Sequence, residues 1–437
     1  MIDKKLFAKY NKKDGLLIIS EYGLFQKGST GLSRFAFNTA QSLKRSRIII
    51  LANKIDGDSQ ILEDNNSLLI RCYTKNSPIS LLNIFLLALK FNKVQSVLFE
   101  FEFASYGNIL SVLIIPFIVF LMRLFCKRVF FAIHQVTDDL KRLHQHLGLE
   151  KRSPLLWFFN LGLGWFYFSL GIFSEKLIVL EKEFMLRLAK FVNKNKMVII
   201  PHGVENISLP INLSKKNEFV ILVFGYIAWY KGLDRLIDSF NNIPSKINGK
   251  TIRLVIAGGY SQAQAGKSHY DRYYQLIINS ASKNKRIRVT GFVPEEKIID
   301  YYAAADLCLV PYREFVSSSG PFSLALSFAK PIILSKELKD YTKSADFEKA
   351  LALSGLNQDE LFIEINPAVL KATVKKIIFD RKYQKQLINF SSNLRKLRSW
   401  NKISRQYNKI FIYKKKGVFL PKIELNLKHK NLQINYS

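Results

Sequence analysis

A cluster of small polar residues lies in the segment 311–334, PYREFVSSSGPFSLALSFAKPIIL, between an apolar strand and an apolar run that predicts a helix. Ser319 is suited to cap that helix and Pro321 to occupy its first turn. Backbone NH groups at a helix start bind anions such as a diphosphate. The candidate phosphate-binding residues are Ser317, Ser318, Ser319 and Gly320, and the nearest acid is Glu314.

Two glycine-bearing turns follow predicted strands, and both are candidates for binding phosphate or sugar. In the first, Gly28 and Gly31 open a helix, where glycine lets the backbone approach a ligand closely. This loop lacks the GxGxxG pattern of dinucleotide sites and their ribose-binding acid about 20 residues on.

In the second glycine turn, Gly225 precedes Lys231, which lies in the first turn of a predicted helix. A lysine at that positive helix end is unfavourable unless an anion offsets it, so we expect Lys231 to bind one; the alternative is a solvated surface lysine.

His134 ends a predicted apolar strand, FFAIHQV, at the carboxyl edge where open α/β sheets bind ligands. Glu100 and Glu102 are two residues apart on an earlier predicted strand and face the same side. They are suited to accept hydrogen bonds from sugar hydroxyls or an acceptor, or they form a solvated edge. The sequence contains no nucleophile elbow and no convincing metal-ligand spacing, so we expect no metal.

These residues lie at the ends of strands in two successive α/β units. The first unit begins with a strand at 15–20, a loop, a helix at 33–44 and a strand at 47–53. Its further strands are expected at 67–73, 94–102, 128–134, 177–181 and 197–201. The second unit begins with VILVFGYIAWYKGLDRLIDSF, which predicts a strand, a glycine turn and an amphipathic helix. Strands and helices alternate throughout, so both units are predicted to be parallel, doubly wound sheets. A basic amphipathic helix is expected at 386–414.

The composition supports two domains with sizeable cores. The 437 residues are 48% hydrophobic and 23% charged, and a chain of this length exceeds a usual single core. Three scattered cysteines without a CxxC pair exclude a disulfide framework and indicate a reducing compartment.

The net charge of +32 favours binding to an anionic membrane surface or to phosphorylated substrates, unless it reflects a general lysine bias. Because the basic residues are scattered and no nucleic-acid-binding motif occurs, we expect no nucleic acid partner.

Two uncharged runs, 103–122 and 154–174, indicate contact with a membrane. The second would be about 30 Å long as a helix, which is enough to cross a bilayer. Its many aromatic residues are typical of the headgroup level, and Pro116 interrupts the first run. We therefore favour helices that lie in the membrane surface over buried core helices, and both over true spans. The polar, lysine-rich N-terminus predicts no cleavable signal peptide.

The order and spacing of several segments resemble glycosyltransferase family four. The segments are the GxxG of the first loop, His134 after its strand, PHGV, FGYIAWYKGLDRLIDSF, LVIAGG, RIRVTGFVPEEKIIDYYAAADLCLVPY and SWNKISRQYNKIF. The resemblance covers nearly the whole chain and is strongest over 199–335. It implies a GT-B fold, in which two Rossmann-like domains face each other across a cleft. It also implies a nucleotide-sugar donor on the C-terminal domain, an acceptor on the N-terminal domain, retention at the anomeric carbon and no metal.

The resemblance assigns roles to single residues. It places Gly28 and Gly31 near the donor phosphates and the acceptor, and His134 close to the transferred sugar. Lys231 corresponds to the lysine that grips the diphosphate, and the turn containing Gly291 and Phe292 corresponds to the loop near the base.

Two departures from the family pattern concern the donor. Tyr226 follows Gly225 where the family usually has arginine. The two family glutamates that contact the donor sugar and the ribose align on Val316 and Leu324. Glu314, two residues before the first position, is the residue expected to replace it in part.

The sequence therefore predicts a retaining, metal-independent glycosyltransferase of the hexosyltransferase type, which needs no cofactor beyond its nucleoside-diphosphate-sugar substrate. It would act at the cytoplasmic face of an anionic membrane, as a peripheral protein, on a glycan or lipid-linked acceptor. The alternatives are a non-catalytic, membrane-bound sugar-nucleotide-binding protein and a sugar-nucleotide epimerase of the same fold. The predicted parts are an acceptor domain at 1–200, a linker at 201–218, a donor domain at 219–385, and a helix with a basic tail at 386–437.

Overall fold

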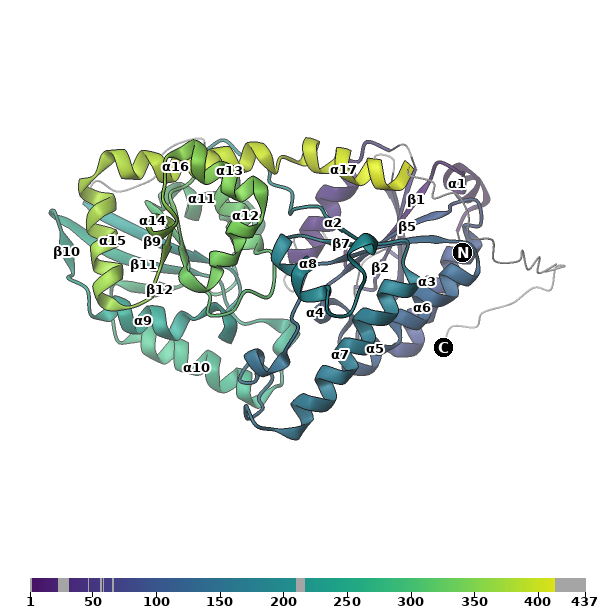
Figure 1. Ribbon diagram of the computed structural model, residues 1–437, viewed down its shortest axis with the longest axis horizontal. Coiled ribbons are helices and arrows are strands. Elements are labelled where there is room, and N and C mark those ends of the chain that lie inside the picture. Colours follow the sequence, from purple (N-terminus) through teal and green to yellow (C-terminus); the bar gives the residue numbers. More distant parts are fainter. Residues whose placement is uncertain are drawn as a thin grey trace.

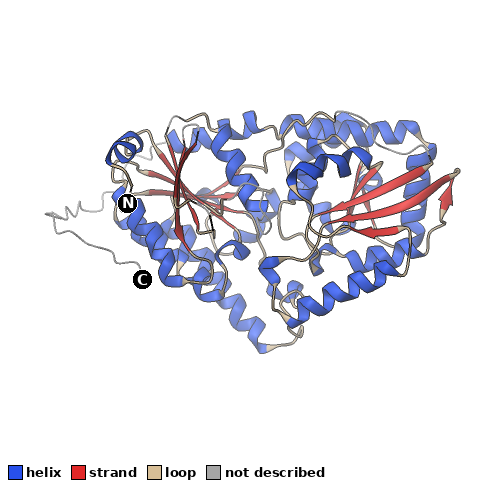
Figure 2. Cartoon of the chain, turned by 180° about the vertical axis from the view of Figure 1, so that it is seen from behind, coloured by secondary structure: helices blue, strands red, loops and turns tan. Residues whose placement is uncertain are grey.

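The computed structural model describes residues 2–22, 31–45, 47–55, 57, 59–64, 67–209 and 217–412. The chain forms two α/β units side by side, each with its own sheet (Figure 1). Helices lie on both faces of each sheet, as expected for doubly wound units (Figure 2). The predicted ligand residue Gly28 lies outside the described residues.

The N-terminal sheet has the strand order β3-β4-β2-β1-β5-β6-β7-β8. Its strands are β1 (Leu16–Ile19), β2 (Ile48–Asn53), β3 (Ile61–Asp64), β4 (Ser67–Tyr73), β5 (Ser96–Phe101), β6 (Arg128–Ile133), β7 (Lys176–Val179) and β8 (Met197–Ile199). All neighbours pair in parallel except β3, which forms an antiparallel pair with β4. The prediction of a wholly parallel sheet is wrong at this edge. Strand β3 is short and mostly exposed, which is typical of an edge strand that limits pairing with other chains.

The helices of this unit form two layers. They are α1 (Lys4–Tyr10), α2 (Gly31–Ser42), α3 (Pro78–Lys90), α4 (Phe103–Tyr106), α5 (Ile109–Leu113), α6 (Ile115–Leu124), η1 (Leu140–Leu143), α7 (Pro154–Phe173), α8 (Lys182–Leu188) and η2 (Lys194–Lys196). Helices α3, α6 and α7 pack with one face of the sheet, and α2 packs with the other.

The uncharged run 103–122 is not one helix but three short ones. The chain breaks at Gly107, whose φ of 99° is unfavourable for residues with a side chain. Asn108 then caps α5, and Pro116 lies in the first turn of α6. These local signals prevent a continuous helix through the run.

The C-terminal sheet has the strand order β10-β11-β9-β13-β14-β15, with β12 also paired to β11. Its strands are β9 (Glu218–Phe224), β10 (Lys246–Ile247), β11 (Lys250–Ala257), β12 (Ile287–Val289), β13 (Leu307–Val310), β14 (Ile332–Ser335) and β15 (Phe362–Ile363). Only β10 pairs in an antiparallel direction, as a hairpin with β11, and this is again an edge strand that the sequence prediction missed.

Helices cover the second sheet on both faces (Figure 2). They are η3 (Trp229–Lys231), α9 (Leu233–Asn241), η4 (Gln262–Gln264), α10 (Ser268–Ser282), α11 (Glu295–Ala304), α12 (Gly320–Ser327), η5 (Lys336–Lys343), α13 (Ala345–Ser354), α14 (Gln358–Leu361), α15 (Pro367–Phe379) and α16 (Arg381–Leu397).

The C-terminal segment returns to the first unit. Helix α17 (Trp400–Ile412) packs against α2, and its Phe411 ring lies 5.0 Å from Phe130 of β6, edge to face (Figure 1). The predicted single helix at 386–414 is wrong, because the chain leaves helical geometry between α16 and α17. Arg398 lies at this break and is almost fully buried, so the interruption serves a contact that sequence periodicity does not reveal.

Candidate active site

The carboxyl ends of the two sheets face each other, and one segment of the second unit reaches across to the first. Gln135 and Ser317 form an antiparallel bridge. The NH of Val136 donates a hydrogen bond to the Val316 carbonyl at 2.8 Å. The Arg187 guanidinium donates to the Phe315 carbonyl at 2.5 Å. The segment after β13 therefore lies beside the residues that follow β6.

Lys231 is the central residue among those that the second unit contributes to the candidate site. Its side chain is buried, and its ring neighbour is Tyr312, with Nζ 6.0 Å from the ring centroid. Gly225 has a φ of 101°, and a Cβ there would lie 2.8 Å from the Lys231 Nζ and 3.0 Å from Cγ of Pro321. The ammonium therefore lies against the glycine turn and the start of α12. The predicted place of Lys231 in the first turn of a helix is wrong, because Lys231 ends η3 and α9 begins only after Gly232.

The Lys231 ammonium is unpaired. Across the described ranges, no hydrogen-bond or ion-pair partner of Nζ is found. Burial lowers its pKa to about 8, and the nearby Glu102 carboxylate partly opposes that shift. The charge is largely retained at neutral pH, so a buried cation faces the space between the units without a bonded counter-ion. Such a group binds an anion strongly, because little water screens the attraction.

The start of α12 is built as predicted, but its serines are largely used within the protein. Ser319 caps the helix, with its Oγ accepting from the Phe322 NH at 3.2 Å. The Tyr312 hydroxyl lies 2.9 Å from the same Oγ. Ser318 donates to Glu181 Oε1 at 3.0 Å, and Ser317 forms the bridge described above. Contacts of these three serines and of Gly320 with phosphate stay a prediction.

His134 is held by a buried carboxylate in the first unit. Its Nε2 lies 2.6 Å from Oε2 of Glu100, which β5 carries and which is fully buried. The imidazole ring also packs edge to face against Phe35 of α2, with centroids 4.4 Å apart. These contacts fix the ring plane of His134.

Glu102 and Glu21 add negative charge on the same side of the site. The Gln135 amide donates to Glu102 Oε1 at 2.6 Å, and the Lys75 ammonium lies 2.7 Å from Glu21 Oε1. Burial raises the pKa of Glu102; the charges of His134, Lys75 and Lys231 oppose this shift, while Glu21 adds to it. The acids of the first unit thus face the cation of the second.

Sequence reasoning missed Glu21, although a signal was present. Glu21 follows β1, just as His134 follows β6 and Glu102 follows β5. The carboxyl ends of parallel strands meet at one sheet edge, so an acid directly after a central strand belongs to the same site.

Glu314 lies in a different electrostatic neighbourhood. Its carboxyl group is half-buried, and burial raises its pKa. The charges that modify this pKa come from Arg142, Arg187, Glu337 and Arg235, and Lys231 is not among them. Its predicted contact with the donor sugar stays a prediction.

The two positions of the missing family glutamates are occupied by packing residues. Val316 is buried at the junction of the two units, and Leu324 is half-buried on α12 against the core. Neither side chain offers a hydrogen bond to a sugar or a ribose.

The loops after β11 and β12 pack against each other, and the first of them also packs against the turn at Gly225. A Cβ at Gly259 would lie 2.8 Å from the Phe292 nitrogen, and a Cβ at Gly258 would lie 2.1 Å from the Gly225 carbonyl oxygen. Only glycine permits these approaches. Gly291 adopts a φ of 75°, and the Phe292 ring that follows it is 37% exposed, so an aromatic face is available beside the glycine turns. Tyr226, in the place of the family arginine, has its pKa raised by burial and by Glu21.

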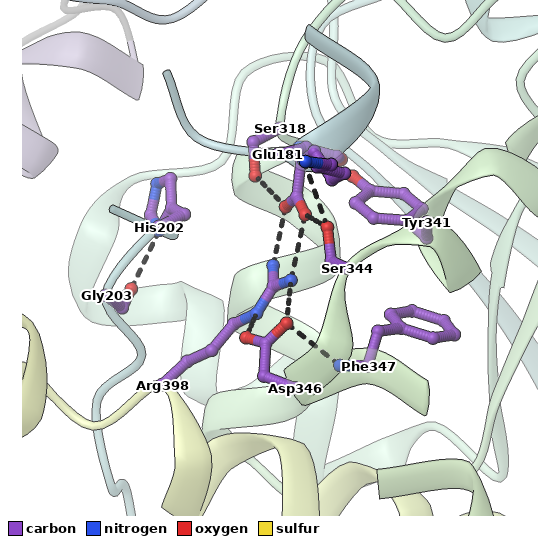
Figure 3. A network of polar contacts seen from close by, with 11 residues as sticks. Glu181, His202, Gly203, Ser318, Tyr341, Ser344, Asp346, Phe347 and Arg398 are labelled. Atoms are coloured by element: carbon purple, nitrogen blue, oxygen red, sulfur yellow. Dashed lines mark hydrogen bonds and ion pairs between the residues drawn. The ribbon is translucent and has the colours of Figure 1, made fainter. Parts of the chain in front are cut away.

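A buried polar network joins the two units (Figure 3). Arg398 donates to Glu181 from both terminal nitrogens, at 2.6 and 2.9 Å, and its Nε donates to Asp346 at 2.7 Å. Ser318 and Ser344 donate to the same Glu181 carboxylate at 3.0 and 2.9 Å. Glu181 follows β7 of the first unit, whereas the other residues belong to the second. Sequence patterns did not indicate this network, because its members are far apart in the chain.

The PHGV segment, residues 201–204, packs at the same junction between the two units. The Val204 NH donates to the Arg398 carbonyl at 2.8 Å, and a Cβ at Gly203 would lie 2.4 Å from the Trp400 ring. His202 Nδ1 lies 2.7 Å from the Gly203 carbonyl oxygen, and burial lowers the pKa of its imidazole to about 3. The segment therefore serves packing between the units.

A small cavity of about 160 Å³ lies where the segment after β6 meets α10. His146, Trp229 and His269 are among its lining residues, and His269 Nε2 lies 3.1 Å from the His146 carbonyl oxygen. Among the residues that the structure describes, no group of three His, Cys, Asp or Glu side chains is arranged to hold a metal ion.

Comparison with known proteins agrees with this architecture. Sucrose-phosphate synthase from Thermosynechococcus elongatus superposes with a TM-score of 0.65 at 15% identity, covering 91% of this chain and 98% of that one. Anabaena HepE in complex with UDP and glucose superposes with a TM-score of 0.61 at 14% identity, covering 91% and 99%. The fold is GT-B. Residues 205–393 of this GT-B chain also match the family described as "Glycosyl transferases group 1".

One curated relative shares detectable sequence identity. It is an uncharacterized glycosyltransferase of Methanocaldococcus jannaschii, 24% identical over 273 residues, or 61% of this chain. The matched part spans 64% of the length of that relative. The matched segment contains Gly225, Lys231 and the start of α12, so the similarity to this family lies in the second unit.

Proposed function

We propose that this protein is a retaining glycosyltransferase that moves a hexose from a nucleoside-diphosphate sugar to a glycan or lipid-linked acceptor. The observation that carries the proposal is the buried ammonium of Lys231, which has no bonded partner among the described residues and lies against Gly225 and the start of α12. A diphosphate is the anion that fits such a place, because it can meet both a cation and backbone NH groups.

In this proposal, Lys231 and the start of α12 stabilise the leaving nucleoside diphosphate as the bond from the anomeric carbon to its oxygen breaks. The acceptor oxygen forms the new bond to the same carbon, on the same face. Its proton passes to an oxygen of the departing phosphate. The chain therefore needs no strong base of its own, and the missing glutamates at Val316 and Leu324 need not abolish transfer.

The residues of the first unit would hold the acceptor and the transferred sugar. His134, oriented by Glu100, and the half-buried Glu102 can accept or donate hydrogen bonds to sugar hydroxyls. Because HepE was solved with UDP and UDP-glucose, uridine-diphosphate sugars are the first donors to test.

The experiment is to incubate the purified protein with UDP-, GDP- and ADP-sugars and to follow nucleotide binding and release. Lys231→Met keeps the length of the side chain and removes the charge. Lys349→Met, on the exposed surface of α13, is the matched control. We expect the first variant to lose binding by about tenfold or more and the control to keep it. Unchanged binding in Lys231→Met would refute the proposed role.

A second candidate is a non-catalytic sugar-nucleotide-binding protein, which the packing residues at Val316 and Leu324 favour. The same experiment separates the two functions. Tight donor binding that depends on Lys231, without sugar transfer to any acceptor and without hydrolysis, would support the second candidate.

A further inference from the structure

Four apolar helices form one outer layer of the first unit. Helices α3, α5, α6 and α7 lie side by side along one side of the N-terminal sheet (Figure 1). The Phe120 ring of α6 lies 5.0 Å from the Phe173 ring of α7, which joins the outer surfaces of these two helices. We call the solvent-facing side of these four helices the apolar face.

Helix α7 has two different sides. Its outer stripe runs the full length of the helix and consists of Leu155, Trp157, Phe158, Leu161, Trp165, Phe168 and Ile172. Trp157 is 58% exposed, Phe158 61% and Trp165 50%. A soluble surface helix carries polar residues on that side, so an outer stripe made of aromatic and aliphatic residues requires an apolar neighbour.

The other three helices extend this surface. Their exposed apolar side chains are Ile79 and Leu86 on α3, Ile109 and Leu110 on α5, and Phe117, Phe120 and Leu124 on α6. The apolar face is therefore continuous across several helices.

The inner side of α7 is fixed to the protein. Leu163, Phe166 and Leu170 are buried in the main core, and a Cβ at Gly171 would lie 2.8 Å from Val192. Asn160 accepts from the Leu140 NH at 2.8 Å and donates to Asp139 at 2.9 Å. By length and composition α7 is the one helix in the described ranges that could cross a membrane. These contacts instead hold it parallel to the surface of the protein.

The four helices, which all lie within the described residues, carry basic residues and no acidic ones. Glu150 precedes α7, and Glu175 follows it and pairs with Arg123 of α6 at 3.1 Å. Exposed basic residues lie at their ends, with Lys90 and Lys93 at the end of α3, and Lys151 and Arg152 before α7. A second copy of this chain, with net charge +32, would be repelled by this surface. An acidic lipid surface would be attracted, and tryptophan and phenylalanine are suited to its headgroup level.

We infer that the apolar face binds the surface of a bilayer containing acidic lipids, with α7 lying in the membrane plane and not crossing it. This inference does not depend on sugar transfer. It would keep the carboxyl ends of β5 and β6, and with them His134, at a fixed height above the lipid. From His134 the chain passes through η1 and then enters α7 at Pro154.

The test is flotation with vesicles of phosphatidylcholine alone or mixed with phosphatidylglycerol. We expect binding to the mixed vesicles that weakens as salt increases. The variant Trp157→Ser/Phe158→Ser/Trp165→Ser should bind about tenfold or more weakly, because three side chains no longer enter the interface. The control Leu353→Ser/Phe379→Ser changes two equally exposed apolar residues of the second unit, 60% and 62% exposed, and should bind like the wild type.

The depth of α7 in the bilayer is tested by quenching of tryptophan fluorescence with lipids that are brominated at different positions of the acyl chain. Trp157 and Trp165 are eight residues apart, or about 12 Å along a helix, so a crossing helix would place them at different depths. The signal of each tryptophan is the difference between a variant that retains it and lacks the other and a variant that lacks both, because Trp229 and Trp400 give a common background. In-plane binding predicts strong quenching of both by shallow bromines.

Three outcomes would overturn the inference. The first is equal binding of the triple variant and the wild type to mixed vesicles. The second is unequal depth of the two tryptophans, which would indicate a span. The third is a vesicle-independent dimer that the triple variant abolishes, which would assign the apolar face to a second copy of the chain. Thermal unfolding of all variants checks that the outer-surface changes leave the fold intact.

Discussion

Arg398 offers the sharpest test of how the two units are held together. Its guanidinium is almost fully buried and makes two hydrogen bonds to Glu181 and two to Asp346. Arg398→Met keeps much of the side-chain volume and leaves a fully buried carboxylate without its counter-ion. Removing one partner of such a pair costs about 3–5 kcal/mol. Ser318 and Ser344 still donate to Glu181, which prevents a larger loss.

The pH dependence of that loss gives a second readout. Burial raises the pKa of Glu181, and Arg398 opposes that shift. Without Arg398 the pKa rises further, so the folded variant prefers the protonated acid. An acid with a raised folded pKa stabilises the fold at low pH and loses that contribution as the pH rises through the folded pKa. The difference between variant and wild type should therefore be smaller at pH 5 than at pH 8.

Urea unfolding, followed by tryptophan fluorescence at both pH values, measures these differences. Lys396→Met, an exposed change on α16, is the control and should shift the midpoint little. Arg398→Met combined with Glu181→Gln should recover part of the loss, because the unpaired charge is removed. A loss below about 1 kcal/mol, or one that is equal at both pH values, would refute the view of Arg398 as the counter-ion of a buried acid.

Three further predictions concern the candidate site. Donor binding, measured by calorimetry, should weaken as the pH rises through about 8, where the Lys231 ammonium loses its proton, and Lys231→Arg should abolish that dependence. Gly225→Ala should weaken donor binding at least about tenfold, because its Cβ would displace the Lys231 ammonium at a strained φ; equal affinity would contradict the close approach. Glu102→Gln should lower the transfer rate more than Glu314→Ala does, since Glu102 lies beside His134 and Lys231; the reverse order in a transfer assay would favour Glu314.

Much of the fold could be predicted because the central strands are short apolar runs bounded by turns. Strand β4 has the predicted boundaries, β2 and β6 differ from theirs by one residue at one end, and β1 differs by one residue at each end. The antiparallel edge strands β3 and β10 escaped prediction, because exposed or two-residue strands leave no hydrophobic periodicity. The break at Arg398 was missed for another reason. A polar residue within an amphipathic pattern does not reveal that tertiary contacts bury it.

The residue types of the candidate site could be predicted from the sequence, but not all of their hydrogen-bond partners. The lysine, the glycine turn and the start of α12 were each visible in the sequence, although Lys231 ends η3 and does not lie in the first turn of α9. The use of Ser318 was not visible, because its partner Glu181 lies in the other unit. Glu21 was overlooked, since a single acid after a strand carries little weight until its neighbours in the sheet are known.

The return of α17 to the first unit bears on how this chain can be recombined with related proteins. A chimera that exchanges everything after the interdomain segment would bring a foreign α17 against α2 and Phe130. The structure instead places the natural exchange points near Val204 and just after Arg398, where the two chain crossings pair with each other. A second unit exchanged at these points leaves α17 with the first unit, and the exchanged unit must supply an arginine that fits Glu181. Donor specificity should therefore be transferable by exchanging one continuous segment, which is joined to the chain at these two points.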